Sequence, residues 1–184
     1  MKKLRADIER FHRMRGRLEV VNTVKLLMTC ANPRMVPVVL LRLAEFFDAH
    51  HLGVLAKICA VLNVMVFGIE ISPKVDIGGG LFLPHTVGTV IGAARIGINC
   101  TIMQGVTLGA STPDLNFTAA VRPVVGDNVT IGSGAKIFGG IVVGNNCNIG
   151  ANAVVLCDVP EYALAVGVPA KILVKPVPGV QNAE

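Results

Sequence analysis

The sequence predicts a mainly β protein built as a parallel β-helix, in which short strands wind around a narrow core. Three observations predict this fold: an aliphatic residue every sixth position, a small or branched residue two positions before it, and a glycine often one position after it. A period of six fits neither an amphipathic helix nor an alternating strand. It is typical of a solenoid in which each repeat supplies one strand and one corner. The repeat residues are Ile71, Ile77, Leu83, Val90, Ile96, Ile102, Leu108, Val125, Ile131, Ile137, Val143, Ile149 and Val155.

Composition agrees with a narrow aliphatic core. The chain has 184 residues, of which 52% are hydrophobic, 4% are aromatic and none is Trp. Val and Ile fill a thin prism well, whereas a wide pocket would need larger side chains. An ordinary buried sheet is the alternative, but a sheet does not need a fixed register of six over thirteen sites.

Residues 1–67 lack the repeat and are expected to form a short helical region. Asn32 and Pro33 suit a helix cap and a first helical position. Two mostly apolar runs follow at 36–47 and 54–67, and Gly68 ends the second. The second run has about fourteen residues, fewer than the roughly twenty that a membrane-spanning helix needs. We therefore expect a buried or interfacial helix.

The N-terminus is basic, and the chain carries a net charge of +5. This charge indicates either a solvated helix face or a contact with anionic lipid or an acidic polymer. The repeat region lacks the interleaved basic and aromatic residues of a nucleic-acid platform, so nucleic acid is not expected as a partner. Seven basic residues stand against Asp7 and Glu9 in the first seventeen positions: Lys2, Lys3, Arg5, Arg10, Arg13, Arg15 and Arg17.

The cysteines indicate a reducing compartment. Their number is odd, and none of the pairs has the C-x-x-C spacing. Packing accounts for Cys100 and Cys147, which occupy the small position of the repeat. No secretory signal follows the basic start. We therefore expect a cytoplasmic protein, with a position at the inner face of the membrane as a further option. All the thiols are expected to be reduced, namely those of Cys30, Cys59, Cys100, Cys147 and Cys157.

The repeat region is expected over 68–174, with one interruption. Residues 109–124 contain turn formers and no period, so they are predicted to form an excursion loop, a type of segment that often carries function. Residues 175–184 are predicted to form a tail.

One histidine stands among the repeats. His85 lies where the register slips, and imidazole is the side chain best suited to act as a general base at neutral pH. Glu70 precedes it by fifteen residues, close to one coil of about eighteen, so its carboxylate is expected either to orient the imidazole or to lie on the surface at the domain entrance. The sequence lacks three clustered metal ligands, so no metal is expected. It also lacks a phosphate loop and a dinucleotide fingerprint.

These residues belong to segments that resemble the serine acetyltransferase branch of the hexapeptide-repeat acyltransferases. The likeness covers 68–173, including Gly68-Ile-Glu-Ile-Ser-Pro, Pro84-His85-Thr-Val-Gly and Val166-Gly-Val-Pro-Ala-Lys171. It implies a left-handed coil, a homotrimer and acetyl-CoA as donor. It also implies that His85 is the base and Glu70 its carboxylate partner. The implied contacts with CoA are Gly109, Ala110, Ser133, Ala151 and Lys171.

Two departures shape the expected acceptor. The family has Asp where this chain has Pro84, and Arg where it has Val121, and those residues hold the amino and carboxylate groups of serine. Gln104 and Arg122 are the remaining expected acceptor contacts. The leading expectation is therefore O-acetylation of a sugar or polysaccharide precursor, as in exopolysaccharide, capsule and colanic acid synthesis. Serine O-acetylation is the first alternative. A catalytically silent scaffold is the second, and the intact His85 argues against it.

Overall fold

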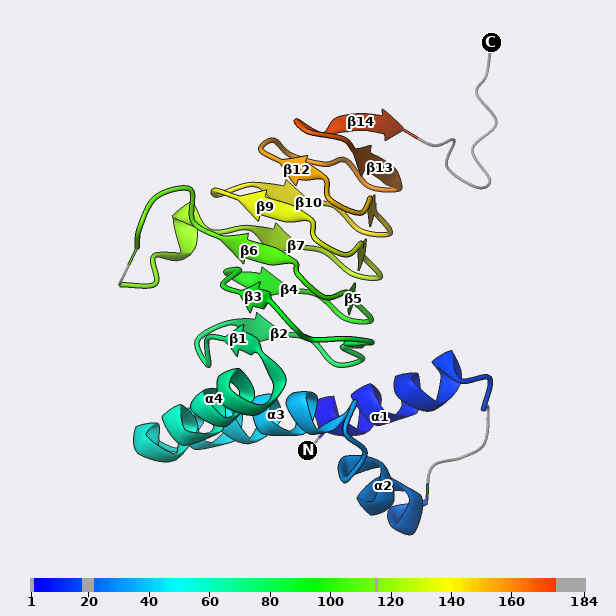
Figure 1. Cartoon of the computed structure of the whole chain (residues 1–184), viewed down its shortest axis with the longest axis vertical. Coiled ribbons are helices and arrows are strands. Elements are labelled where there is room, and N and C mark those ends of the chain that lie inside the picture. The colour runs from blue at the N-terminus through cyan, green and yellow to red at the C-terminus, as the bar shows by residue number, and fades with distance from the viewer. Residues whose placement is uncertain (1, 18–21, 115, 175–184) are drawn as a thin grey trace.

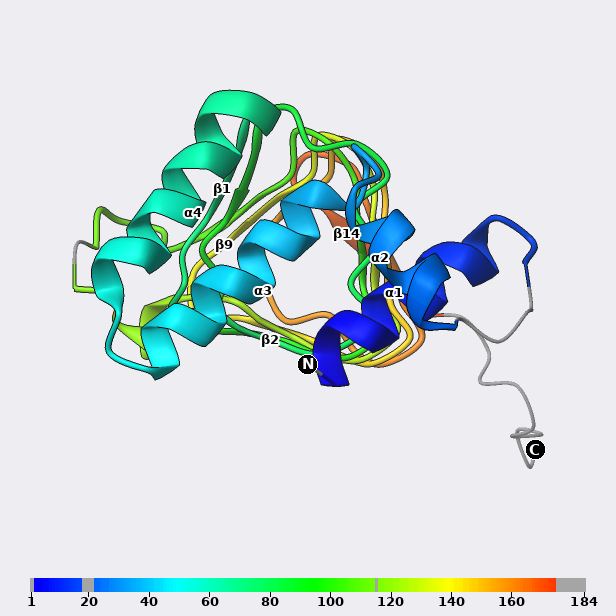
Figure 2. The same ribbon diagram turned by 90° about the horizontal axis from the view of Figure 1, so that it is seen from below.

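The computed structural model describes residues 2–17, 22–114 and 116–174. Within these residues the α-helices come first and the strands follow, with one short 3-10 helix, η1 (Ala119–Val121), in the excursion loop (Figure 1). The helices are α1 (Lys2–Met14), α2 (Thr23–Cys30), α3 (Val36–Ala49) and α4 (Gly53–Phe67). They form a layer under one end of a column of coils, with α3 beside α4 and α1 (Figures 1 and 2).

The coils form three sheets, which are the three sides of a prism with a triangular outline (Figure 2). Every pairing is parallel except that of β13 with β14. Sheet A contains β1 (Ile69–Ile71), β3 (Thr89–Ile91), β6 (Thr107–Gly109), β9 (Lys136–Phe138) and β12 (Val154–Val155). Sheet B contains β2 (Asp76–Ile77), β4 (Arg95–Ile96), β7 (Val124–Val125) and β10 (Val142–Val143). Sheet C contains β5 (Thr101–Ile102), β8 (Thr130–Ile131), β11 (Asn148–Ile149), β13 (Ala163–Val166) and β14 (Lys171–Val174).

The repeat residues form the core, with one correction. Twelve of the thirteen predicted positions are buried in a single cluster. Val90 is the exception, because Ile91 takes the inward position of β3, and Ile91 is paired with Ile71 one coil below. The corner before β3 holds two extra residues rather than one. The sequence count therefore shifted by one position at this strand, and a shift of one reverses the face of every side chain in a strand.

The glycines that follow the repeat residues are explained by close approach between coils. Gly132 is an example, since a Cβ at this position would lie 2.7 Å from the backbone nitrogen of Ala151 in the next coil. Positive φ angles occur at a different corner position, at Gly88 (73°), Gly105 (71°) and Gly134 (73°). A left-handed conformation strains residues with a side chain, so glycine or asparagine is favoured there.

The predicted apolar runs are helices, although Asn32 and Pro33 do not form the expected helix start. Asn32 lies in a turn before α3, where its side chain accepts a hydrogen bond from the backbone N–H of Arg34 (3.0 Å), and α3 begins at Val36. Pro37 therefore supplies the early helical proline in place of Pro33. Gly68 ends α4 as predicted, with a left-handed φ of 62°.

A buried ion pair joins the helical layer to the first coil. The Arg42 guanidinium of α3 donates to both carboxylate oxygens of Asp7 in α1 (2.8 and 3.1 Å), and these side chains are 6% and 0% exposed. Arg42 also donates to the carbonyl oxygen of Gly78 (2.7 Å), and Asp7 accepts from the N–H of Leu81 (2.8 Å). Burial lowers the pKa of Arg42, but Asp7 and Glu45 outweigh that effect and raise it above its ordinary value.

Within the described residues, no helix combines the length and the apolar character needed to cross a membrane. All five cysteines are free. The tail predicted at 175–184 lies outside the described residues.

Removing the charge of Asp7 should destabilise the fold strongly. Asp7→Asn leaves the Arg42 guanidinium buried without its counter-charge, and such a loss costs about 3–5 kcal/mol. Equilibrium urea unfolding at fixed protein concentration would measure the change. The control is Glu9→Gln, which removes the exposed Arg5–Glu9 pair and should cost less than about 1 kcal/mol. Equal effects of the two substitutions would show that the buried pair does not hold the helical layer in place.

Candidate active site

The corners between sheet C and sheet A form one continuous edge of the prism, here called the His85 edge. It consists of His85 and the corner residues 67–68, 86–88, 104–105, 133–134 and 151–152. Backbone hydrogen bonds connect each corner to the one below it. The N–H groups of Gly88, Gly105, Gly134 and Asn152 donate, in that order, to the carbonyl oxygens of Gly68 (2.9 Å), Val87 (3.1 Å), Gln104 (2.9 Å) and Ser133 (2.8 Å). Residues far apart in sequence therefore form one column.

His85 and Glu70 flank the lowest corners of this edge. The Thr86 hydroxyl donates to Phe67 O (2.8 Å), which fixes the residue after His85 directly against the end of α4. Glu70 follows three residues after Phe67, on the outward face of β1. Both His85 and Glu70 are exposed. Among the described residues neither side chain has an ion pair or hydrogen bond with the other, so both remain accessible to a substrate.

Sheet A carries a second column beside the edge. Register pairs Glu70 with Val90, Val90 with Thr107, and Thr107 with Lys136, all on the outward face. The Lys136 ammonium donates to Gly105 O and to the Thr107 hydroxyl (3.1 Å), which places a cation beside the corner that follows Gln104. The repeat count did not identify Lys136. A charged residue at an outward strand position was the available signal.

The expected CoA contacts occupy two places. Ser133 and Ala151 lie on the His85 edge. The segment before β14 is bonded to Val154, whose N–H donates to Gly167 O (3.0 Å) and whose carbonyl oxygen accepts from the Ala170 N–H (2.8 Å). Lys171 begins β14 directly after this segment. Gly109 and Ala110 lie at the opposite end of β6, where the chain leaves the prism (Figure 1). Sheet A therefore separates the two groups within one chain.

The excursion loop is held by an ion pair at its base. Arg122 and Asp114 are both 11% exposed, and the guanidinium donates to the Asp114 carboxylate (3.1 Å) and to Gly92 O (2.9 Å). It also lies 4.2 Å over the ring of Phe117. Arg122 thus anchors the loop to the coil below, and most of its donors are already used.

Asp114 is tuned to stay ionised. Desolvation raises the pKa of its carboxyl, but hydrogen bonds from the Thr118 N–H (2.6 Å), Arg122 and the Asn116 N–H outweigh this and lower the pKa below its ordinary value. A lowered folded-state pKa means that the anchor is complete above the unfolded value of about 4 and is lost as the pH falls through the folded value.

The cysteines in the core are poor nucleophiles. Burial raises the pKa of Cys100 to about 11 and also raises that of Cys147, so both thiols are protonated at neutral pH. Across the described segments no three His, Cys, Asp or Glu side chains are grouped to hold a metal ion. The imidazole of His85 is therefore the strongest candidate for proton transfer on the prism.

Comparison with known proteins bears on the family. The bacterial transferase hexapeptide family, with six repeats, matches residues 122–157. A serine acetyltransferase of Helicobacter pylori strain J99 is 42% identical over 135 residues, which are 73% of this chain and 77% of that protein. A serine acetyltransferase of Staphylococcus xylosus is 46% identical over 121 residues, 65% of this chain. A solved serine acetyltransferase in complex with CoA has a TM-score of 0.78 at 31% identity, covering 94% of this chain and 68% of that one.

This chain belongs to the serine acetyltransferase family. It spans about half (55%) of the Staphylococcus relative. The expectation of an acetyltransferase enzyme is confirmed at the level of the family. The expectation of a sugar or polysaccharide acceptor is wrong, because the relatives and the solved structure are all named serine acetyltransferases. The likeness to exopolysaccharide, capsule and colanic acid enzymes is likewise unsupported. Missing charges at Pro84 and Val121 were too little evidence for changing the acceptor class.

Loosening the loop anchor should expose the loop to protease. Asp114→Asn removes the charge that Arg122 and two backbone N–H groups contact, so chymotrypsin should cleave after Phe117 about tenfold faster at neutral pH. The control is Glu161→Gln, which removes a carboxylate hydrogen-bonded to Asn145 on a distant corner. Cleavage after Phe117 at the wild-type rate in Asp114→Asn would contradict this account of the anchor.

Proposed function

We propose that this protein transfers the acetyl group of acetyl-CoA to the hydroxyl of serine. The observation that carries the proposal is the His85 edge, where the exposed imidazole of His85 and the exposed carboxylate of Glu70 flank the same corners on a chain related to serine acetyltransferases. The names of the relatives support acetyl-CoA as donor and serine as acceptor, and the exposure of His85 supports its proposed role as the base. The free cysteines support a cytoplasmic location, since thiols stay reduced there.

The proposed step is direct transfer. The neutral His85 imidazole takes the proton of the serine hydroxyl as the oxygen attacks the thioester carbonyl carbon. The carbon–sulfur bond then breaks, and the CoA thiolate leaves and takes up the proton. Glu70 accepts the other ring N–H, which selects the tautomer and stabilises the imidazolium. This role requires the Glu70 carboxylate to turn toward the corner above it.

Donor binding is proposed to use backbone and small side chains. Ser133 and Ala151 leave room along the His85 edge, whereas Gly109 and Ala110 lie beyond sheet A. Within one chain, sheet A lies between these two groups, so they cannot line one groove together. We therefore assign the donor groove to the boundary between two subunits, with Lys171 at its upper end. The proposed assembly is therefore a homotrimer of left-handed coils.

Acceptor binding needs groups other than Pro84 and Val121, which carry no charge. Gln104 is exposed one coil above His85 on the same edge, and its amide is the proposed contact for the serine carboxylate. Arg122 is proposed to act on the acceptor side by holding the loop, because its guanidinium is already bonded to Asp114 and Gly92.

Removing the base should lower turnover sharply. His85→Ala should reduce kcat with serine by at least about a hundredfold, because general-base help contributes about 10²–10⁴. Glu70→Gln should do less harm, since it weakens orientation and leaves the base. The control is His51→Asn, at an exposed turn with a φ of 59° that asparagine tolerates. Release of CoA thiol measures all three, and near-normal turnover of His85→Ala would exclude the proposed mechanism.

A shared donor groove predicts complementation between inactive subunits. Each chain weighs 19.3 kDa, so light scattering should give about 58 kDa for the trimer. Ala110→Tyr should block the groove from the side opposite the His85 edge, and co-expression with His85→Ala should restore up to about a quarter of wild-type activity. That fraction is the chance that an intact base meets an intact neighbouring groove in random trimers. A monomer at working concentration, or no recovery in mixed trimers, would contradict the shared site.

A further inference from the structure

The outer side of α4 is an apolar surface that no element covers among the described residues. Its most exposed stripe recurs at helical spacing, with Val54, Ile58, Val61 and Met65, and Val54 and Met65 are 74% and 79% exposed. Lys57 is the one charged residue in the helix. A surface helix normally presents polar residues outward, so an apolar outward stripe indicates a partner.

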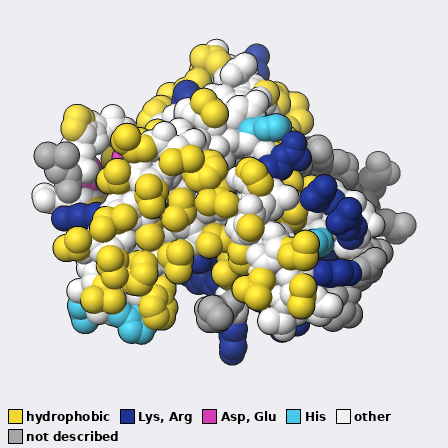
Figure 3. Space-filling view, turned by 60° about the horizontal axis from the view of Figure 1, so that its bottom comes forward, with side chains coloured by type: hydrophobic (Ala, Val, Ile, Leu, Met, Phe, Trp, Pro, Cys, Tyr) yellow, Lys and Arg dark blue, Asp and Glu magenta, His cyan; other side chains and the backbone are white. Residues whose placement is uncertain are grey.

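The apolar surface continues onto the neighbouring helices. Leu43 and Phe46 of α3 are exposed beside α4, and Leu27 and Met28 of α2 are exposed on the same end of the molecule. Figure 3 shows this end, where hydrophobic side chains cover much of the visible face and Asp and Glu are nearly absent. The surface made by α2, α3 and α4 is here called the apolar base.

Basic residues gather next to the apolar base. Residues 1–67 contain eleven Lys and Arg against five Asp and Glu, a net charge of +6, whereas the rest of the chain has six against seven. Two of the acids are engaged by Arg42, namely Asp7 and Glu45. The excess positive charge of the protein is thus concentrated in its helical layer, and Figure 3 shows Lys and Arg side chains along one side of the apolar area.

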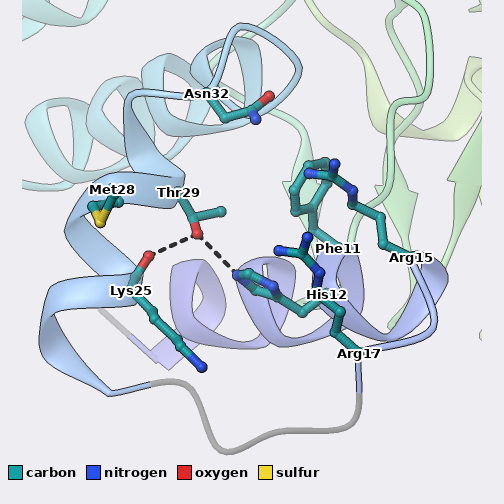
Figure 4. Close-up of a pocket in the computed structure, with 8 residues that line it drawn as sticks. All are labelled: Phe11, His12, Arg15, Arg17, Lys25, Met28, Thr29 and Asn32. Atoms are coloured by element: carbon teal, nitrogen blue, oxygen red, sulfur yellow. Dashed lines mark hydrogen bonds between the residues drawn. The ribbon is translucent and has the colours of Figure 1, made fainter.

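A basic hollow of about 270 Å³ opens between α1 and α2, at the margin of the apolar base (Figure 4). Arg15, Arg17 and Lys25 contribute cations to its lining, and Met28 of the apolar base lines it from α2. Thr29 forms its polar floor, hydrogen-bonded to His12 Nε2 (2.9 Å) and donating to Lys25 O (2.7 Å). This combination suits a phosphate next to hydrocarbon.

We infer that the apolar base docks on an anionic phospholipid bilayer, with α2 and α4 resting in the interface and the basic hollow taking lipid phosphate. Charge complementarity selects this occupant. Two copies of the chain meeting base to base would bring together two helical layers that each carry +6, most of it on residues 2–17 beside the base, which opposes association, whereas anionic lipid neutralises the same charge. Peripheral helices of this kind bind through apolar burial together with attraction to anionic headgroups.

The proposed trimer would strengthen the docking. If its threefold axis runs along the coil, the three helical layers face the same direction and reach one flat surface together. Three weak contacts on one membrane then act with an avidity well above that of one. The inference does not depend on the identity of the acceptor.

Vesicle co-sedimentation of the full chain tests the docking. The protein should sediment with vesicles of phosphatidylcholine and phosphatidylglycerol at low salt, and with neither phosphatidylcholine alone nor anionic vesicles at about 1 M salt, where the Debye length is about 3 Å. Val54→Glu with Ile58→Glu should weaken binding by more than about tenfold. The control Leu156→Glu, at an exposed leucine near the far end of the prism, should bind as the wild type.

The electrostatic part has its own matched pair. Arg13→Gln with Arg17→Gln should weaken binding by about fivefold for each charge removed. Lys74→Gln with Arg95→Gln removes the same charge from the repeat region and should change little.

Wild-type protein that stays in the supernatant with anionic vesicles at low salt would overturn the inference. A second result would also overturn it: wild-type trimers that associate in pairs, and that separate when Val54→Glu and Ile58→Glu are introduced together. The apolar base would then be an interface between copies of this chain. Serine acetylation measured on the same samples separates a failure of the proposed function from a failure of docking.

Discussion

The stacking of one coil on the next is the constraint on which the structure depends. Each inward aliphatic residue lies over its counterpart in the coil below, and parallel hydrogen bonds hold the two in register, as Val143 over Val125 shows with a spacing of eighteen residues. The narrow core leaves little tolerance for a change in coil length, since buried side chains are closely packed. Extra residues can therefore be placed only at corners. The two insertions into the period, at 84–88 and 109–124, are the segments that contain His85 and Arg122.

The same constraint explains why the lower end needs the helices. A solenoid that stops abruptly exposes the core of its last coil, and capping elements cover it. Here α1 and α3 cover the first coil, and Ile8, Met35 and Leu41 join the same buried cluster as the prism. The Asp7–Arg42 pair satisfies carbonyl and N–H groups of this coil that no further coil can pair. Covering the core in this way leaves the outer surface of the layer apolar.

Local patterns in the sequence predicted much of the fold and part of the site. The inward residues and α4 could be found because their spacing is set by elements a few residues long. Val90 was assigned wrongly because a corner can absorb two residues as readily as one, and only the pairing of β3 with β1 decides between them. His85 stood out because it broke the period. Lys136 did not, because its contact with Gly105 links residues 31 positions apart. The acceptor was misjudged because Pro84 and Val121 report two lost contacts and say nothing of the groups that replace them.

Identification of the acetylated product tests the central claim most directly. The purified chain would be incubated with acetyl-CoA and either L-serine or L-alanine, which differs by the single hydroxyl, and the products analysed by mass spectrometry. The account predicts O-acetylserine in amounts equal to the CoA released, with saturation in serine, and no acetylated product from alanine. Intact acetyl-CoA after incubation with saturating serine, or equal acetylation of the two amino acids, would contradict hydroxyl-directed transfer to serine at the His85 edge.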